Sequence, residues 1–303
     1  MNLTRNAFEL LSFLERRGSG KYTQRQLAAE LSCSVGIINK ILKEFLENSY
    51  ITIDNEITIT RKGLEILEPY RVKRAIIIAA GFSERLAPIT FETPKPLVTI
   101  HGTRIIDTII DNLLAVGIED ISIIVGYKED AFKVLLDKYP SVTLLYNPLF
   151  NQSGNITSLY TARDKIEQCY ICDADLYINH SEVFRKYEYS SCFLGTPVLG
   201  TDDWCFIHSG SRIHHISRGG DKCYKAIFIA YFNTEDGIKL QRDLQTKMEQ
   251  RGGKECWWFD CLFSSDSSSY SLDIRNCYPE EVYEIDTIGD LIALDNSYSS
   301  ISL

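Results

Sequence analysis

A chain of 303 residues with 45% hydrophobic and 24% charged residues is long enough for two domains with substantial cores. No apolar run approaches the roughly 20 residues of a membrane-spanning helix, so we expect no membrane segment. The net charge of −9 is uneven: residues 1–74 carry 12 Lys and Arg against 9 Asp and Glu, and the remainder is acidic. An acidic surface repels nucleic-acid phosphates, which makes the larger part a poor nucleic-acid binder. Nine cysteines, an odd number, predict free thiols in a cytoplasmic protein.

Residues 1–70 have the pattern of a small winged helix-turn-helix domain. Apolar residues recur at helical spacing in three segments, and Thr23 is placed to cap the second. The stretch YITIDNEITIT alternates on either side of Asp54-Asn55, which predicts a β-hairpin. The predicted elements are three helices, the hairpin and a closing helix, at 8–14, 27–31, 35–46, 50–60 and 62–70.

The third of these helices is the candidate DNA-reading element. Asn39, Lys40 and Lys43 would face the major groove of DNA. No arginine lies on this helix and residues 1–74 are only weakly basic, so a module for dimerisation or ligand sensing is the alternative. DNA and a second copy of the chain are therefore candidate partners.

From about Val72 the pattern changes to alternating strands and helices, typical of a mostly parallel sheet covered by helices. We expect this α/β domain to occupy residues 71–303. Its first half should contain strands at 75–79, 120–125, 142–146 and 169–172, separated by helices at 105–116, 129–139 and 155–166. Its second half should contain strands at 191–196, 204–208, 212–217 and 223–232, then helices at 235–250 and around 290–293.

The first strand of this domain is followed by a turn of small residues, in the run IAAGFSERLAPITFETPKPL. Such a turn can bring backbone N–H groups close to a phosphate chain. Arg85 and Lys95 then supply the positive charge that a triphosphate needs. The residues predicted to contact the phosphates through the turn are Ala79, Ala80, Gly81, Phe82 and Ser83.

Two acids follow another buried strand, in the run ICDAD. Asp173 and Asp175 are two residues apart, so they point to the same side of an extended chain and suit a hard divalent cation such as Mg²⁺. The structural alternative is a strand-end turn, where Asp is common.

The segment 78–97 resembles the signature of the nucleoside-triphosphate transferases that make nucleotide sugars and CDP-alcohols, roughly L-A-A-G-x-G-x-R-L, then T, then P-K-x-L. Ser83 stands where the second glycine is usual. Residues 73–296 are more specifically similar to the bacterial CTP:phosphocholine cytidylyltransferases. The similar segments are HGTRIIDTIIDNL, NITSLYTA, ICDADLYIN, CWWFDCLF and VYEIDTIGDL.

The resemblance implies a Rossmann-like nucleotidyltransferase domain with a mixed, mostly parallel sheet. It implies a Mg²⁺ ion held by Asp175 and Asp286, with Lys95 and Arg85 as the catalytic cations. Asn155 and Ser158 would match polar positions that contact the base or ribose. The implied reaction joins CTP and phosphocholine into CDP-choline and pyrophosphate.

A quaternary ammonium donates no hydrogen bonds, so proteins bind it with aromatic faces and nearby negative charge. The chain has three tryptophans, and all lie in the region expected to receive the acceptor; Tyr283 lies close to Asp286 in sequence. We expect one of the two adjacent tryptophans to face the pocket, and core packing is the alternative for each. The candidate acceptor-binding residues are Trp204, Trp257, Trp258, Asp260 and Tyr283, with Asp202 and Asp203 as further negative charges.

Two other functions fit the same residues. One is a nucleotidyltransferase that acts on a sugar 1-phosphate or on aminoethylphosphonate. The other is a transcription regulator whose enzyme-like half senses CTP or a choline metabolite. Arg85, Lys95, Asp175 and Asp286 together argue against a purely sensory domain, because sensing needs no full metal site.

Overall fold

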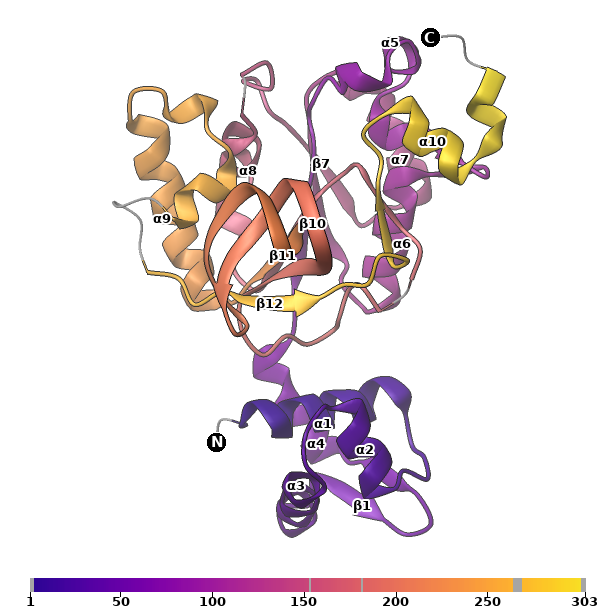
Figure 1. The fold of residues 1–303 in the computed structure, drawn as a ribbon, viewed down its shortest axis with the longest axis vertical. Helices are drawn as coiled ribbons and strands as arrows, with labels where there is room; N and C mark the ends of the chain where they lie inside the picture. Colours follow the sequence, from indigo (N-terminus) through magenta and orange to yellow (C-terminus); the bar gives the residue numbers. More distant parts are fainter. Residues whose placement is uncertain (1–2, 153, 181, 264–268, 301–303) are drawn as a thin grey trace. The chain divides into compact units, whose positions relative to one another are not determined.

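The computed structural model describes residues 3–152, 154–180, 182–263 and 269–300 (Figure 1). The chain divides into two compact units, Met1–Arg71 with Tyr187–Tyr189, and Val72–Lys186 with Ser190–Leu303. Among the described residues, no helix is both long and apolar enough to cross a bilayer.

The described part of the N-terminal unit contains four α-helices, a hairpin and a closing 3₁₀ turn at Glu68–Tyr70. Side chains of Thr4, Thr23, Ser34 and Thr60 each accept a hydrogen bond from a backbone N–H in the first turn of the helix that follows, which explains where these helices begin. The elements are α1 (Arg5–Arg17), α2 (Gln24–Glu30), α3 (Val35–Glu47), β1 (Ile51–Ile53), β2 (Ile57–Ile59) and α4 (Arg61–Leu67).

A short segment from much later in the chain completes this unit. The Tyr189 ring stacks on the Tyr70 ring with centroids 5.7 Å apart, and it lies 5.4 Å from the Phe8 ring. Tyr187 is buried in the same core as Phe8 and Phe45. Residues 187–189 therefore belong to the N-terminal core, although they are distant in sequence.

The second unit is built on a seven-stranded mixed sheet with the order β10-β12-β11-β8-β3-β6-β7. Strand β3 pairs in parallel with β6 and β8, and β6 pairs in parallel with β7, whereas β11 runs antiparallel to β8. The strands are β3 (Arg74–Ala79), β6 (Asp120–Val125), β7 (Val142–Tyr146), β8 (Cys169–Asp173), β10 (Cys192–Ser209), β11 (Arg212–Phe232) and β12 (Asp273–Asn276).

Helices cover both faces of this sheet, as Figure 1 shows. One face packs on α6 and α7 through a core that contains Ile77, Ile109 and Leu135. The other face packs on α8 and α9 through a core that contains Ile76, Leu159 and Leu240. Alternating residues of β3 thus enter opposite cores, as the two-residue period of a strand requires. The helices are α6 (Ile105–Ala115), α7 (Val134–Lys138), α8 (Ile156–Thr161) and α9 (Thr234–Glu249).

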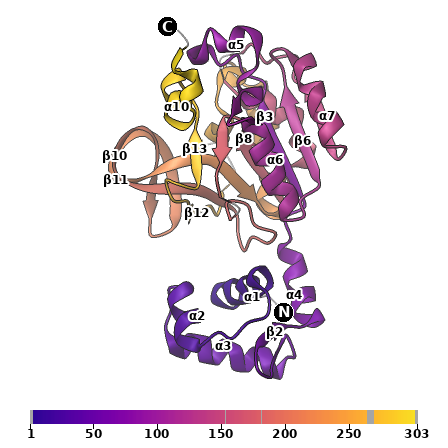
Figure 2. The same ribbon diagram turned by 90° about the vertical axis from the view of Figure 1, so that its right-hand side faces the viewer.

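Two short strand pairs and two helices lie at one end of the sheet. Strand β9 pairs antiparallel with β13, and β4 pairs with β5. Figure 2 shows α5 and α10 at the same end, where both elements pack in one small core. These elements are β4 (Thr99–Ile100), β5 (Thr103–Arg104), β9 (Leu176–Ile178), β13 (Val282–Glu284), α5 (Ile89–Glu92) and α10 (Ile288–Leu294).

The predicted α/β class is confirmed, but several predicted extents were wrong. The four late strands are two long ones, because the polar stretch between residues 198 and 204 stays paired with β11 through register shifts. The helix predicted over 155–166 ends at Thr161 and continues as a 3₁₀ turn at Arg163–Lys165. The helix predicted over 129–139 begins as a 3₁₀ turn at Glu129–Lys133.

Candidate active site

The turn after β3 has the backbone shape that a glycine would take most readily. Ser83 has φ 54° and ψ 50°, in the left-handed region. Its carbonyl accepts a hydrogen bond from the Thr90 hydroxyl at 3.1 Å, which helps to hold the turn. A Cβ added to Gly81 would meet no atom within 4 Å, so the turn opens onto free space.

Pairing of β9 with β13 explains how two distant acidic segments meet. Asp175 precedes β9, and Glu284 at the end of β13 stands opposite Leu176. The Ile285 amide donates to the Asp175 carbonyl at 2.9 Å. The Asp290 carboxylate accepts from the Asp286 amide at 3.0 Å, which fixes the chain where α10 begins.

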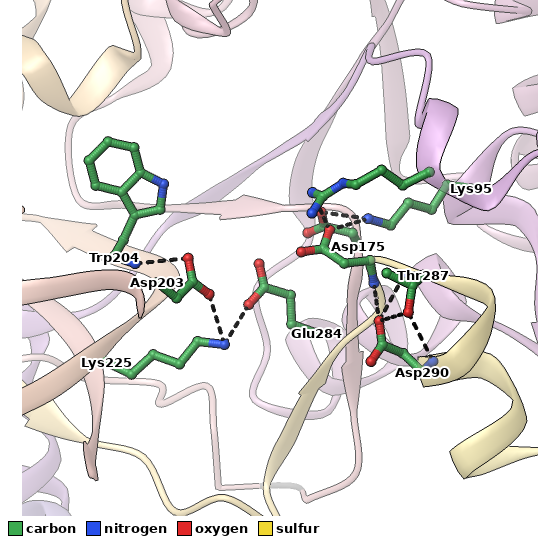
Figure 3. A network of polar contacts seen from close by, with 10 residues as sticks. Lys95, Asp175, Asp203, Trp204, Lys225, Glu284, Thr287 and Asp290 are labelled. Carbon is green, nitrogen blue, oxygen red and sulfur yellow. Dashed lines mark hydrogen bonds and ion pairs between the residues drawn. The ribbon is translucent and has the colours of Figure 1, made fainter. Parts of the chain in front are cut away.

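Lys95 lies between the two aspartates. Its ammonium donates to Asp175 at 3.0 Å and to Asp286 at 3.1 Å, and its side chain is only 6% exposed (Figure 3). Burial alone would lower the pKa of Lys95, but the two carboxylates outweigh it and raise the pKa above its usual value. The exposed Arg85 guanidinium donates to Asp286 at 2.7 Å.

Asp175, Glu284 and Asp286 form an acidic triad, each offering one oxygen within 4.8 Å of the others. Mg²⁺ prefers oxygen ligands and is usually held by one or two carboxylates together with phosphate and water oxygens, so these residues fit that ion. Glu284 was missed in the sequence, although its position two residues before Asp286 in VYEID puts both on one side of an extended chain. Burial and the nearby Asp175, partly offset by Lys225, raise the pKa of Glu284 to about 7.

A second lysine joins the triad to the long hairpin. The Lys225 ammonium on β11 lies 3.1 Å from Glu284 and 3.0 Å from Asp203 on β10 (Figure 3). Lys225 thus bridges Asp203 and Glu284 of the triad. Asp203 is also the neighbour of Trp204 in sequence.

Asp173 lies beside this network. One of its carboxylate oxygens is buried and has no hydrogen-bond partner among the described residues. Burial, followed by the charges of Asp175 and Glu284, raises its pKa well above the usual range. The ionised form of Asp173 is therefore disfavoured beside the acidic triad.

A pocket opens in front of the β3 turn and connects these features. Eight of its lining residues were candidates from the sequence: Ala79, Gly81, Ser83, Lys95, Asn155, Asp173, Asp175 and Trp257. Its other lining residues are Ile78, Pro96 and Ala174.

The adjacent tryptophans have different environments. Trp257 is 40% exposed and lines the pocket, whereas Trp258 is 1% exposed and stacks on Phe193 in the core. Trp257 also stacks on Phe259, with centroids 6.1 Å apart and the planes 7° apart. The Asp260 carboxylate accepts from the Trp257 amide and holds this turn.

Trp204 and Tyr283 are not among the residues that line this pocket. Trp204 packs edge-on against Phe259 at 5.2 Å. Tyr283 is on β13, opposite Tyr177 of β9.

The remaining predicted nucleotide contacts have structural partners. The Ala80 carbonyl accepts from the Tyr127 amide, and the Phe82 ring packs on the Tyr127 ring at 5.2 Å. The buried Ser158 hydroxyl accepts from Asn147 at 3.1 Å, which places it in the interior. Asn155 lines the pocket and also accepts from the Trp258 amide at 3.0 Å.

On α3 of the N-terminal unit, Asn39, Lys40 and Lys43 are all exposed. Lys43 is 3.9 Å from Glu47 one turn later, so part of its charge is offset. The three predicted DNA-reading side chains are therefore on the protein surface.

Comparisons with known proteins agree with the geometry of the second unit. Residues 74–192 match the family model described as nucleotidyl transferase. The chain is 35% identical over 228 residues to a 2-aminoethylphosphonate cytidylyltransferase of Lancefieldella rimae, covering 74% of this chain and 92% of that protein. It is 41% identical over 223 residues to a choline-phosphate cytidylyltransferase of Streptococcus pneumoniae, covering 73% of this chain and 96% of that protein. A solved structure of CTP:phosphocholine cytidylyltransferase from the same organism superposes with a TM-score of 0.68 at 27% identity, covering 75% of this chain and 99% of that one.

Proposed function

Because the chain belongs to the nucleotidyl transferase family, we propose that it moves CMP from CTP to a small acceptor with a phosphonate or phosphate group and an ammonium group. The names of the two cytidylyltransferase relatives support CTP as the donor. The observation that carries the proposal is the meeting of Lys95, Asp175 and Asp286 beside the turn after β3.

The reaction needs no activated side chain as nucleophile, because an acceptor phosphonate or phosphate oxygen is already ionised near neutral pH. That oxygen attacks the α-phosphorus of CTP and forms a new P–O bond. The bond to the bridging oxygen of the β-phosphate breaks, and pyrophosphate leaves with the electron pair. Catalysis then rests on alignment and on neutralising the phosphate charge.

Each charged side chain has a role in that scheme. The Lys95 ammonium stabilises charge on the α-phosphate and the acceptor, and the Arg85 guanidinium holds the leaving pyrophosphate. Asp175, Glu284 and Asp286 would hold Mg²⁺, which when bound supplies positive charge to phosphate oxygens. In the free protein Asp175 and Asp286 hold the Lys95 ammonium at the wall of the pocket, where it can reach a bound phosphate.

We place 2-aminoethylphosphonate first among the acceptors, ahead of the phosphocholine expected from the sequence. A primary ammonium donates three hydrogen bonds and therefore needs carboxylate acceptors. Asp203 is a partly exposed carboxylate next to Trp204 in sequence, and the Lys225 ammonium lies between it and Glu284. The relative from Lancefieldella rimae supports the same acceptor.

Phosphocholine is the second candidate, and one observation favours it. The exposed Trp257 face, stacked on Phe259, offers an aromatic surface of the kind that binds a quaternary ammonium. The Streptococcus pneumoniae relative supports this acceptor. Both acceptors carry an ionised phosphorus–oxygen group and an ammonium group. They differ in the methyl groups on nitrogen and in the link to phosphorus, which is a C–P bond in the phosphonate and a C–O–P ester in phosphocholine.

A pyrophosphate-release screen tests the proposal directly. The purified full chain with Mg²⁺ is given CTP, UTP, ATP or GTP with 2-aminoethylphosphonate, phosphocholine or a sugar 1-phosphate. We expect release with CTP and 2-aminoethylphosphonate, and loss of release in Asp175→Asn at unchanged folding. Release with UTP and a sugar phosphate would replace the proposal by a nucleotide-sugar enzyme, and no release with any pair would favour the sensor alternative.

For the N-terminal unit, we propose DNA binding as a second role. Support comes from the order α2, short turn, α3 and hairpin, and from the exposed Asn39, Lys40 and Lys43. A gel shift of the full chain on duplex DNA at low salt should be weakened by Lys40→Glu with Lys43→Glu. If the unaltered chain causes no shift at low salt, this role is ruled out.

A further inference from the structure

All three carboxylates of the triad are already ion-paired with cations of the chain itself. Lys95 bridges Asp175 and Asp286 at 3.0 and 3.1 Å, and Arg85 contacts Asp286 at 2.7 Å. Glu284 is paired with Lys225 at 3.1 Å. The oxygens that suit a divalent cation are the same oxygens that hold these ammonium and guanidinium groups.

A divalent cation that enters alone would have to displace its competitors. The whole Lys95 residue is only 5% exposed, so its ammonium would be poorly hydrated once it is displaced from the carboxylates. An unpaired buried charge is strongly unfavourable, and a new double positive charge beside it adds repulsion. The free site therefore disfavours a metal ion that arrives without a counter-anion.

A triphosphate removes this obstacle by giving two of the cations new partners. Phosphate oxygens accept charge-assisted hydrogen bonds from ammonium and guanidinium groups as carboxylates do. Lys95 lines the pocket in front of the β3 turn, and the Arg85 side chain is 69% exposed and can swing from Asp286. When both move to phosphate, Asp175 and Asp286 are released for the metal.

We propose that Lys95 and Arg85 couple metal binding to nucleotide binding, so that the triad binds a divalent cation well only when a nucleoside triphosphate is present. This deepens the proposed function and rests on it for the identity of the nucleotide. By linkage, the metal must tighten nucleotide binding by the same factor. Lys225 is not expected to contribute to this coupling. It lies between Asp203 and Glu284, so it keeps Asp203 as a carboxylate partner when the metal binds Glu284.

The test measures Mn²⁺ binding to the full chain, with and without CTP and without any acceptor. Water-proton relaxation separates protein-bound Mn²⁺ from free Mn²⁺ and from the Mn²⁺–CTP complex in solution. The readout is the ratio of the Mn²⁺ dissociation constant without CTP to that with CTP. We expect a ratio on the order of 10 or more in the unaltered chain, within the usual range of coupling between sites.

Three variants decide whether these residues cause the coupling. Arg85→Met and Lys95→Met should tighten Mn²⁺ binding in the absence of CTP and bring the ratio towards one. Lys225→Met is the matched control, because it removes one positive charge from the same triad and should leave the ratio within about twofold of the unaltered chain, well short of a coupling effect. Arg85 is exposed, so its replacement does not threaten folding, and tryptophan fluorescence verifies the fold of Lys95→Met.

The proposal is overturned if the unaltered chain binds Mn²⁺ equally well with and without CTP. It is also overturned if Lys225→Met reduces the ratio as much as the other two variants, since loss of charge alone would then explain the effect. Failure of the proposed function is seen separately. In that case the ratio responds to CTP as expected while no acceptor in the screen releases pyrophosphate.

Discussion

Replacing Glu284 by glutamine should stabilise the second unit at alkaline pH in the absence of metal. The Glu284 side chain is 21% exposed, and one of its carboxylate oxygens lies within 4.8 Å of carboxylate oxygens of Asp175 and Asp286. Burial and these charges raise its pKa from 4.5 to about 7, even though Lys225 acts in the opposite direction. The ionised form of Glu284 is thus unfavourable in the folded protein.

The raised pKa of Glu284 decides whether the free energy of unfolding rises or falls with pH. Below about pH 4.5 the carboxyl is protonated in both the folded and unfolded chain, and Glu284 causes no penalty. Glu284 loses its proton near pH 4.5 in the unfolded chain but only near pH 7 in the folded protein. As the pH rises through about 7, the folded state therefore loses stability relative to the unfolded chain. At 1.36 kcal/mol per pKa unit the loss reaches about 3 kcal/mol at pH 8, as an upper value for a partly exposed group. Glutamine resembles the protonated acid, and Lys225 keeps Asp203 as its partner.

Urea unfolding followed by tryptophan fluorescence measures this effect, with EDTA present. Trp204, Trp257 and Trp258, the three tryptophans of the chain, all lie in the second unit, so the signal reports that unit alone. We expect Glu284→Gln to be more stable than the unaltered chain by up to about 3 kcal/mol at pH 8 and equal to it near pH 4.5. Equal stability at pH 8, or a variant less stable than the unaltered chain, would refute the reasoning.

The other predictions concern turnover, the two tryptophans and a crowded glycine. Lys95→Met should lower pyrophosphate release about 100-fold or more at unchanged circular dichroism, since it removes charge aimed at the transition state; near-normal turnover would contradict its role. Trp257→Ala should raise the acceptor KM without changing the unfolding midpoint, whereas Trp258→Ala should reduce stability by about 3–5 kcal/mol through a core cavity; identical effects of both changes would show that the structure does not distinguish them. Gly154→Ala should raise the KM for CTP and lower the melting temperature, because the added Cβ would lie 1.9 Å from the Cys256 carbonyl oxygen; unchanged values would argue against this close approach.

Local patterns in the sequence were sufficient for the parts of the site that follow strands directly. Lys95 and Asp175 were recognisable because a strand-end turn and an acid after a buried strand have local signals. Asp286 was identified by family resemblance, and its meeting with Asp175 depends on the pairing of β9 with β13. That pairing joins segments about a hundred residues apart, and no local pattern encodes it.

Residues whose role depends on orientation were harder to predict. Trp257 and Trp258 are neighbours in sequence, and only the three-dimensional turn held by Asp260 decides which ring reaches the pocket. Ser158 has a polar side chain that suits a nucleotide contact, but its buried hydroxyl accepts a hydrogen bond from the Asn147 side chain. Lys225 carried no signal at all, because its importance comes from a contact with β13.

The discontinuous core of the N-terminal unit limits how that unit can be transplanted. A chain cut after Arg71 would leave Phe8 and Tyr70 without the ring of Tyr189, and would open apolar surface to water. Tyr187 is 116 residues from Arg71 along the chain, so the missing piece cannot be recovered by moving the cut a few residues. Exchange of this unit between proteins, in the laboratory or over evolutionary time, therefore requires matched changes in two separate stretches of the gene.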